Sequence, residues 1–365
     1  MNRSKILAVT LSVAMAAMLL AGCAQPTASN AESAARSNAA ESDSVKPEMV
    51  LKLATGAAES ENATTSNGVF WTTFQDYLSE KSNGKYKLDI FYSSQLASST
   101  EEYFNGLLGG SFDFITCNIS QIGTYTTAFA PINAPFFFPS EEGARELLTK
   151  SPFREKMNAQ FLADASVKQL AYVPMGFRML TSKKKMVQSP ADMKGLKLRT
   201  MADPYQIAAF SALGANCTPT PYSELFTALQ QGLVDAQESP YITIWGQKIY
   251  EVQNYVTETK HNFTSTLAAC SDETFNSWPA DLQQLVLEAA AVAEQAAWDS
   301  VGKFADDAKA KVAEKLEIRE LSAEELKAFQ DVASTSWDVI KADCGEAYFN
   351  EAVAAMQEIN EKLEK

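Results

Sequence analysis

This 365-residue sequence has very little histidine and no closely spaced pair of cysteines. It contains one histidine, His261, and five cysteines with no close pairs. Because structural zinc sites need closely spaced cysteine or histidine ligands, this pattern argues against one. Cysteine spacing leaves open whether the residues beyond Cys23 form disulfides or are buried thiols. These residues are Cys117, Cys217, Cys270 and Cys344.

Positive charge is also scarce. Lysine and arginine number 31 against 45 aspartates and glutamates, which gives a formal net charge of −14. Nucleic-acid binding requires a basic face, so nucleic acid is excluded as a partner. An acidic protein that binds an anion must do so with a few local positive groups rather than with its overall field.

Only the N-terminus carries a long apolar run. Arg3 and Lys5 precede an apolar stretch from 6 to 21, which predicts an export signal over residues 1–22. The stretch ends in Leu-Ala-Gly-Cys, which resembles the lipobox of bacterial lipoproteins and predicts acylation of Cys23; the alternative is an ordinary cleaved signal with an unrelated cysteine. Residues 23–47 are poor in large apolar side chains and are expected to form a flexible tether.

The first half of the remaining chain alternates between strand and helix patterns. Strands are predicted over 50–54, 86–92, 112–117 and 168–173, and helices from Ser66, over 101–108 and after the Ser140 cap. This alternation is typical of an α/β layer fold. No catalytic or phosphate-binding motif interrupts it: a nucleophile elbow, a phosphate loop and a paired-carboxylate motif are all lacking.

The second half repeats the alternation and then turns helical. Ser189-Pro190 predicts a helix start, strands are expected over 196–201 and 233–238, and helices over 204–213 and 222–231. The Ala- and Glu-rich stretch 280–316 predicts one helix too long for a single lobe to cover. A capping box at Ser322 and Glu325 then starts further helix, up to residue 365.

Several motifs occur in an order that identifies a family. The segments are LKLATG, FYSSQLASSTEEYFNGLLGGSFDF, APFFF, MGFR, GLKLRTM, GANCTPTPYSELFTALQQGLVDAQESP and KIYEVQNYVTETKH. Together they resemble the DctP-type substrate-binding proteins of tripartite ATP-independent periplasmic (TRAP) transporters over about 49–290. The resemblance implies two α/β lobes joined by crossing strands and a long helix. One lobe would comprise 48–175 and 264–303, and the other 176–263 and 304–365.

The resemblance also assigns roles to charged residues. Arg199 stands where the family arginine holds the ligand carboxylate, and a guanidinium offers two parallel donors that suit this task. Alternation with Leu196 and Leu198 would by itself place Arg199 on a solvated face. Arg178 matches a second arginine near the cleft, with a surface position as the alternative. Glu238 matches the glutamate that orients the carboxylate-binding arginine.

Further candidate contacts come from the same motifs. Ser239 replaces a family asparagine that contacts ligand, and Asn118 stands where sialic acid binders carry glutamate, so both argue against sialic acid. Thr55 is another candidate contact. Phe177, Tyr241 and Phe136 are candidates for apolar walls, with plain core as the alternative. No chemistry is assigned to His261, because a lone histidine is most often structural.

The implied function is capture of a small organic acid anion outside the cytoplasmic membrane and delivery to a TRAP-type permease. The protein is expected to be a lipid-anchored monomer without a cofactor or metal. Two alternatives stay open: a sensory lipoprotein that docks on a receptor kinase, and an enzyme built on the same kind of cleft.

Overall fold

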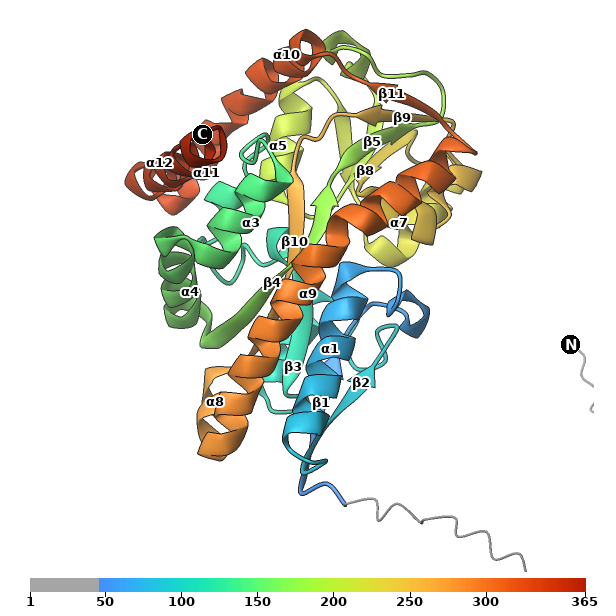
Figure 1. Cartoon of the computed structure of the whole chain (residues 1–365). Coiled ribbons are helices and arrows are strands. Elements are labelled where there is room, and N and C mark those ends of the chain that lie inside the picture. The colour runs from blue at the N-terminus through green and yellow to red at the C-terminus, as the bar shows by residue number, and fades with distance from the viewer. Residues whose placement is uncertain (1–45) are drawn as a thin grey trace, which may run out of the picture. The chain divides into compact units, whose positions relative to one another are not determined.

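A computed structural model describes residues 46–365. The predicted export signal, the Cys23 lipidation site and almost all of the predicted tether lie outside these residues. Within 46–365, no helix has both the length and the apolar composition that a membrane crossing requires. The described part is an α/β structure built on two sheets (Figure 1).

The first sheet has five strands in the order β2-β1-β3-β10-β4. The first three are parallel, and β10 runs antiparallel to both β3 and β4. Their bounds are β1 Met49–Ala54, β2 Tyr86–Phe91, β3 Phe114–Asn118, β4 Val167–Phe177 and β10 Phe263–Ser271. The helices that accompany them are α1 Ser66–Lys81, α2 Thr100–Leu108, α3 Glu141–Lys150, α4 Pro152–Ala165 and α8 Asp272–Ser277. We call this part the first lobe.

The second sheet has six strands in the order β11-β9-β5-β8-β6-β7. They are β5 Met179–Ser182, β6 Lys197–Thr200, β7 Asn216–Pro219, β8 Ala236–Ser239, β9 Tyr255–Glu258 and β11 Glu317–Glu320. Its helices are α5 Pro204–Ala212, α6 Leu225–Gln230, α7 Tyr241–Gly246 and α10 Ala323–Ala333. We call this part the second lobe. The chain passes between the lobes from β4 to β5 through Arg178, and from β9 to β10 through residues 259–262.

The long helix predicted over 280–316 is present as α9, Ala280–Ala313. At 1.5 Å per residue its 34 residues extend about 51 Å. Its first half, from Leu282 to Ala297, packs into the core of the first lobe, and Ala308 and Val312 pack into the second. A helix this long keeps its apolar face covered only because both lobes contribute to it. Figure 1 shows α9 running along both lobes.

The C-terminal helices return to the first lobe. Phe329 of α10 packs in the second lobe, but Phe349 and Met356 pack with residues of α3 and α4. They belong to α12, Glu346–Leu363, which follows α11, Trp337–Cys344. The resemblance had placed this last segment in the second lobe. The predicted capping box that starts α10 is present, with Ser322 and Glu325 bonding to each other's main-chain N–H groups.

Two of the predicted elements in the second lobe are divided or shortened. The helix expected over 222–231 is divided into a 3-10 turn, Tyr222–Glu224, and α6. The strand expected from 233 begins only at Ala236, because Gly232 turns the chain with a φ of +71° and Leu233 is exposed. A Gly-Leu pair therefore ends a helix here rather than starting a strand.

Gly68, in the first turn of α1, packs closely against the main chain of the loop before this helix. A Cβ added there would lie 2.4 Å from the Asn62 Cα and 2.5 Å from the Glu61 carbonyl oxygen. We expect Gly68→Ala to destabilise the protein by about 1 to 3 kcal/mol in urea unfolding, because main chain cannot move aside as a side chain can. Gly302→Ala, inside α9 where the nearest atom is 3.4 Å away, is the matched control and should be neutral or stabilising. Equal effects of the two changes would contradict this prediction.

Candidate functional site

Arg199 is a buried arginine without an acidic partner. It lies on β6, is 2% exposed, and donates from Nε and Nη2 to the Thr220 carbonyl oxygen at 3.0 and 2.6 Å. No carboxylate of residues 46–365 lies within ion-pair distance of it. Burial lowers the pKa of Arg199 to about 10, while the charge of Glu238 opposes this shift. The guanidinium therefore stays charged at neutral pH.

The burial of Arg199 overturns the expectation from strand alternation. In β6 only Lys197 is exposed, and the next three residues are all buried. The strand lies between β8 and β7 inside the sheet, and such strands are covered on both faces. A buried charge that meets only one carbonyl oxygen is costly, so this site is suited to receive an anion.

The carboxyl ends of strands from the two lobes meet beside this arginine. Asn118 ends β3, and Met201 follows β6, which ends at Thr200. The Ser120 Oγ lies 3.9 Å from the Met201 Sδ, which joins the two ends across the lobes. We call this region the inter-lobe junction. Ligands of open α/β sheets bind outside the carboxyl ends of strands, so the junction is the natural place for one.

Arg178, the second candidate arginine, is already neutralised. Its Nε and Nη2 donate to the Glu238 carboxylate, Nη2 also reaches the Glu238 carbonyl oxygen at 2.7 Å, and Nη1 donates to Thr264 at 3.2 Å. It is 3% exposed and lies where β4 passes into β5. Arg178 thus connects the chain crossing to the second sheet, and its charge is balanced without a ligand.

Glu238 therefore holds a different arginine from the one expected. It forms its ion pair with Arg178 and has no hydrogen bond to Arg199. His261, on the other crossing segment, contacts the same carboxylate at 3.1 Å and Thr259 at 2.7 Å. Burial would raise the pKa of Glu238, but the charge of Arg178 and the hydrogen bonds from His261 and Arg178 lower it to about 2. Both crossings are thus fastened to one buried carboxylate.

The other predicted contacts fall into two groups. Thr55 directly follows β1 and Asn118 ends β3, both in the first lobe. Thr55 accepts the Ala57 N–H at 3.1 Å, and Asn118 accepts the Ser120 N–H at 3.1 Å. The second group makes its contacts with other side chains of the protein: Ser239, Tyr241 and Phe177. Ser239 donates to Gln237 at 2.7 Å, Tyr241 donates to Glu258 at 2.8 Å, and the Phe177 ring lies 5.2 Å from Phe263. The structure brings Arg199 and Asn118 to the same junction, and their roles toward a ligand stay predictions.

Two residues that follow the carboxyl ends of strands, Tyr222 and Glu61, were not singled out from the sequence. Tyr222 follows β7 and is 48% exposed, and Glu61 ends the 3-10 turn Glu59–Glu61 that follows β1. Partial burial raises the pKa of the Tyr222 phenol, the Glu61 charge raises it further, and the Arg199 charge lowers it. An exposed aromatic residue just after a strand was the available signal for Tyr222, whereas nothing in the sequence marks Glu61.

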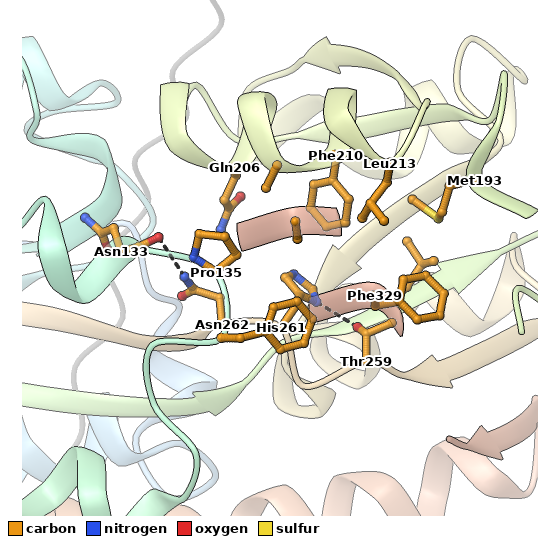
Figure 2. A pocket seen from close by; sticks show the side chains of 14 residues that line it. Asn133, Pro135, Met193, Gln206, Phe210, Leu213, Thr259, His261, Asn262 and Phe329 are labelled. Atoms are coloured by element: carbon orange, nitrogen blue, oxygen red, sulfur yellow. Dashed lines mark hydrogen bonds between the residues drawn. The ribbon is translucent and has the colours of Figure 1, made fainter. Parts of the chain in front are cut away.

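A small cavity lies next to His261 and the other residues of the second chain crossing rather than at Arg199 (Figure 2). Its volume is about 20 Å³, room for about one water molecule. Phe136, Phe210 and Phe329 line it together with His261, and Gln206 is buried beside it with neither amide atom bonded. The cavity is an internal packing gap near the chain crossings and is too small for an organic acid.

The described residues contain neither a metal-ligand cluster nor a disulfide. Residues 46–365 contain no group of three histidine, cysteine or acidic side chains that could hold a metal ion. Cys117, Cys217, Cys270 and Cys344 are free thiols. Burial raises the pKa of Cys117 to about 12, so this thiol stays protonated.

Two lobes joined by crossing strands and a shared helix, with a buried arginine at their junction, define a solute-binding protein of the two-lobe class. Residues 56–343 match the model of a protein family described as bacterial extracellular solute-binding protein, family 7. The chain belongs to this family, as its sequence motifs predicted.

Known relatives agree with this assignment. A solute-binding protein of Verminephrobacter eiseniae is 33% identical over 61% of this chain and 66% of its own length. A crystal structure of the sugar acid binding protein of Advenella mimigardefordensis with galactonate has a TM-score of 0.80 and 28% identity, and the match covers 86% of this chain and 99% of that one. A TRAP periplasmic solute-binding protein from Shewanella oneidensis with bound succinate has a TM-score of 0.78 and 26% identity, over 85% and 100% of the two chains. Both confirm the two-lobe fold.

Proposed function

We propose that this protein captures a small carboxylate in the junction between its lobes and delivers it to a TRAP-type membrane permease. The observation that carries the proposal is Arg199, a charged and buried guanidinium whose hydrogen-bonded partner is one carbonyl oxygen. A ligand carboxylate would supply the missing negative charge and accept two parallel N–H bonds. The acids bound by the two structural neighbours, galactonate and succinate, share this group.

The proposed ligand contacts are divided between the two lobes. Arg199 belongs to the second lobe, whereas Thr55 and Asn118 belong to the first. A ligand held by Arg199 would therefore contact both lobes and favour the arrangement in which they are closed over it. Arg178, bound to Glu238, acts in this proposal as a positioning residue for the crossing segments rather than as a second carboxylate contact.

A thermal melting screen of organic acids tests this function. A ligand that binds only the folded protein stabilises it by about 2.7 kcal/mol at a hundred times its dissociation constant, which raises the melting temperature by several degrees. We expect at least one carboxylate of a broad panel to do this with the parent protein and not with Arg199→Met. A panel in which no acid shifts the melt would overturn the proposal.

The cellular placement is part of the same proposal. The export signal and the Leu-Ala-Gly-Cys sequence support secretion and acylation of Cys23, which would hold the protein at the outer face of the membrane on the tether that follows. Globomycin-sensitive processing, or mass spectrometry of the mature N-terminus, would test the lipid. An unmodified mature N-terminus beyond Cys23 would show export without an anchor.

We also propose that the bound acid is released unchanged. Belonging to a solute-binding family supports this. Incubation with the acid found in the melting screen, followed by mass spectrometry, should recover it intact. A time-dependent product that disappears with Arg199→Met would instead indicate an enzyme.

A further inference from the structure

The amide of Asn118 has a fixed orientation at the carboxyl end of β3. Its Oδ1 accepts the Ser120 main-chain N–H at 3.1 Å and the Ser120 hydroxyl at 2.9 Å. A main-chain N–H can only donate, so the atom that it contacts must be the amide oxygen and not the nitrogen. The Nδ2 group makes no hydrogen bond with any residue of 46–365, and Asn118 is partly exposed. The amide oxygen is therefore occupied, whereas both N–H groups can donate to a ligand.

Ser120, which orients this amide, lies directly against the second lobe. Its Oγ is 3.9 Å from the Sδ of Met201, and both residues are buried. Met201 is two residues after Arg199 in the chain. The Arg199 guanidinium lies at the same edge of the second sheet, because it contacts the carbonyl oxygen of Thr220, which follows the end of β7. Side-chain contacts therefore join Asn118, through Ser120, to the segment that carries Arg199.

Thr55, just past the end of β1, has the same arrangement as Asn118. Its Oγ1 accepts the main-chain N–H of Ala57, two residues further on, at 3.1 Å, which leaves the hydroxyl proton to be donated. The strands β1 and β3 are parallel neighbours, so Thr55 and Asn118 lie at one edge of the first sheet. The guanidinium of Arg199 likewise has N–H donors and no acceptor. These three candidate contacts therefore all have donors available for a ligand.

We propose that Asn118 is a specificity-determining donor, that Ser120 is the residue that positions it, and that the ligand is an oxo or hydroxy acid rather than an amino acid. This inference rests on the proposed function. With its carboxylate on Arg199, such an acid has a second oxygen that accepts a hydrogen bond from the Asn118 Nδ2 group. An ammonium group only donates, so it would meet donors and leave the Asn118 amide without a partner. Because Ser120 fixes the amide before binding, the contact costs less ordering of the side chain.

Matched acids test this assignment by calorimetry on the purified full chain. One set places a hydroxyl or an amino group on carbon 2, 3 or 4 of butyrate, with butyrate itself as the unsubstituted acid. Larger pairs are gluconate and glucosaminate, 2-oxoglutarate and glutamate, and phenylpyruvate and phenylalanine. We expect the best oxygen-substituted acid to bind at least about tenfold more tightly than its amino counterpart, which corresponds to about 1.4 kcal/mol. An amino or unsubstituted acid that binds the parent as tightly as the best oxygen-substituted acid would overturn the assignment.

The variant Asn118→Asp keeps the shape of the side chain and can still accept both bonds from Ser120, but its second oxygen accepts instead of donating. The ratio of hydroxy-acid to amino-acid affinity should therefore fall by at least about tenfold. The matched control is Asn350→Asp, which adds the same charge at an exposed position of α12 and should leave the ratio unchanged. Equal ratios in the two variants would contradict the role of Asn118.

The variant Ser120→Ala tests the positioning role. It removes one of the two bonds that fix the amide, so the oxygen can turn toward an ammonium group, and the same ratio should fall by about threefold. Melts of the ligand-free variants show whether each is folded. A folded Ser120→Ala protein with the parent ratio would overturn the positioning role. If acids bound through Arg199 without regard to Asn118, the proposed function would stand without this inference, whereas absence of any Arg199-dependent binding would overturn both.

Discussion

Replacing Arg199 by methionine should remove ligand binding without weakening the fold. Loss of one partner from a buried charge pair costs about 2 to 5 kcal/mol of binding free energy, so we expect affinity to fall by at least about 30-fold. The ligand-free protein should melt no lower than the parent, because the variant no longer buries an unpaired charge. Titration calorimetry and thermal melts measure the two effects on the same samples.

Lysine at the same position separates charge from geometry. Arg199→Lys keeps a positive charge but cannot form two parallel N–H bonds to a carboxylate, so it should recover little of the lost affinity. Arg145→Met is the matched control, since Arg145 forms a partly exposed pair with Asp299 on the surface. Its affinity should equal that of the parent. Parent-like binding by Arg199→Lys would contradict the two-donor contact and reduce the role of Arg199 to a point charge.

The second large effect is expected on stability. Glu238→Gln keeps the shape of the side chain but leaves Arg178 buried without its counter-charge. Breaking one side of a buried pair costs about 3 to 5 kcal/mol, which urea unfolding at pH 7 should detect. The control Asp89→Asn removes one partner of the exposed Lys87–Asp89 pair and should cost less than about 1 kcal/mol. A Glu238→Gln protein as stable as the parent would show that Arg178 finds another partner.

The same carboxylate gives the parent a predictable dependence on pH. The folded protein lowers the pKa of Glu238 from its ordinary 4.5 to about 2, so its contribution to stability is fully present above pH 4.5. It is lost as the pH falls from 4.5 toward 2, and its size is about 3 kcal/mol. Urea unfolding at steps from pH 7 to pH 3 should therefore show a smaller loss in Glu238→Gln than in the parent. Parallel pH profiles of the two proteins would contradict the assigned pKa.

The ion-pair partner of Glu238 could not be predicted from the sequence alone. The family motifs singled out Arg178, Arg199 and Glu238 and assigned Glu238 to Arg199, whereas in the structure Glu238 forms its ion pair with Arg178. Arg178 lies 60 residues before Glu238 in the chain and meets it because β5 and β8 are neighbours in the second sheet. Which arginine remains unpaired depends on that strand order, and no local pattern contains it.

Local signals were reliable where a segment determines its own structure. The alternation in Tyr86, Leu88 and Ile90 predicted β2, the Ser322 and Glu325 pair predicted the start of α10, and the long glycine-poor stretch predicted α9. In the two helices the interactions join residues one to four positions apart, and the alternation of β2 is itself a local pattern although its hydrogen bonds are made to β1. The strand expected over 233–238 starts three residues late, at Ala236, because Gly232 at positive φ turns the chain before it.

The sequence by itself determined the alternation of strands and helices, the family, and a short set of polar residues suited to an acid ligand. The burial of Arg199, its lack of an acidic partner and the neutralisation of Arg178 by Glu238 arise only in the folded molecule. The physical reason is that charge balance and burial are properties of groups brought together from distant parts of the chain. The sequence specifies the charge of a side chain, whereas the folded structure determines which group lies next to that charge.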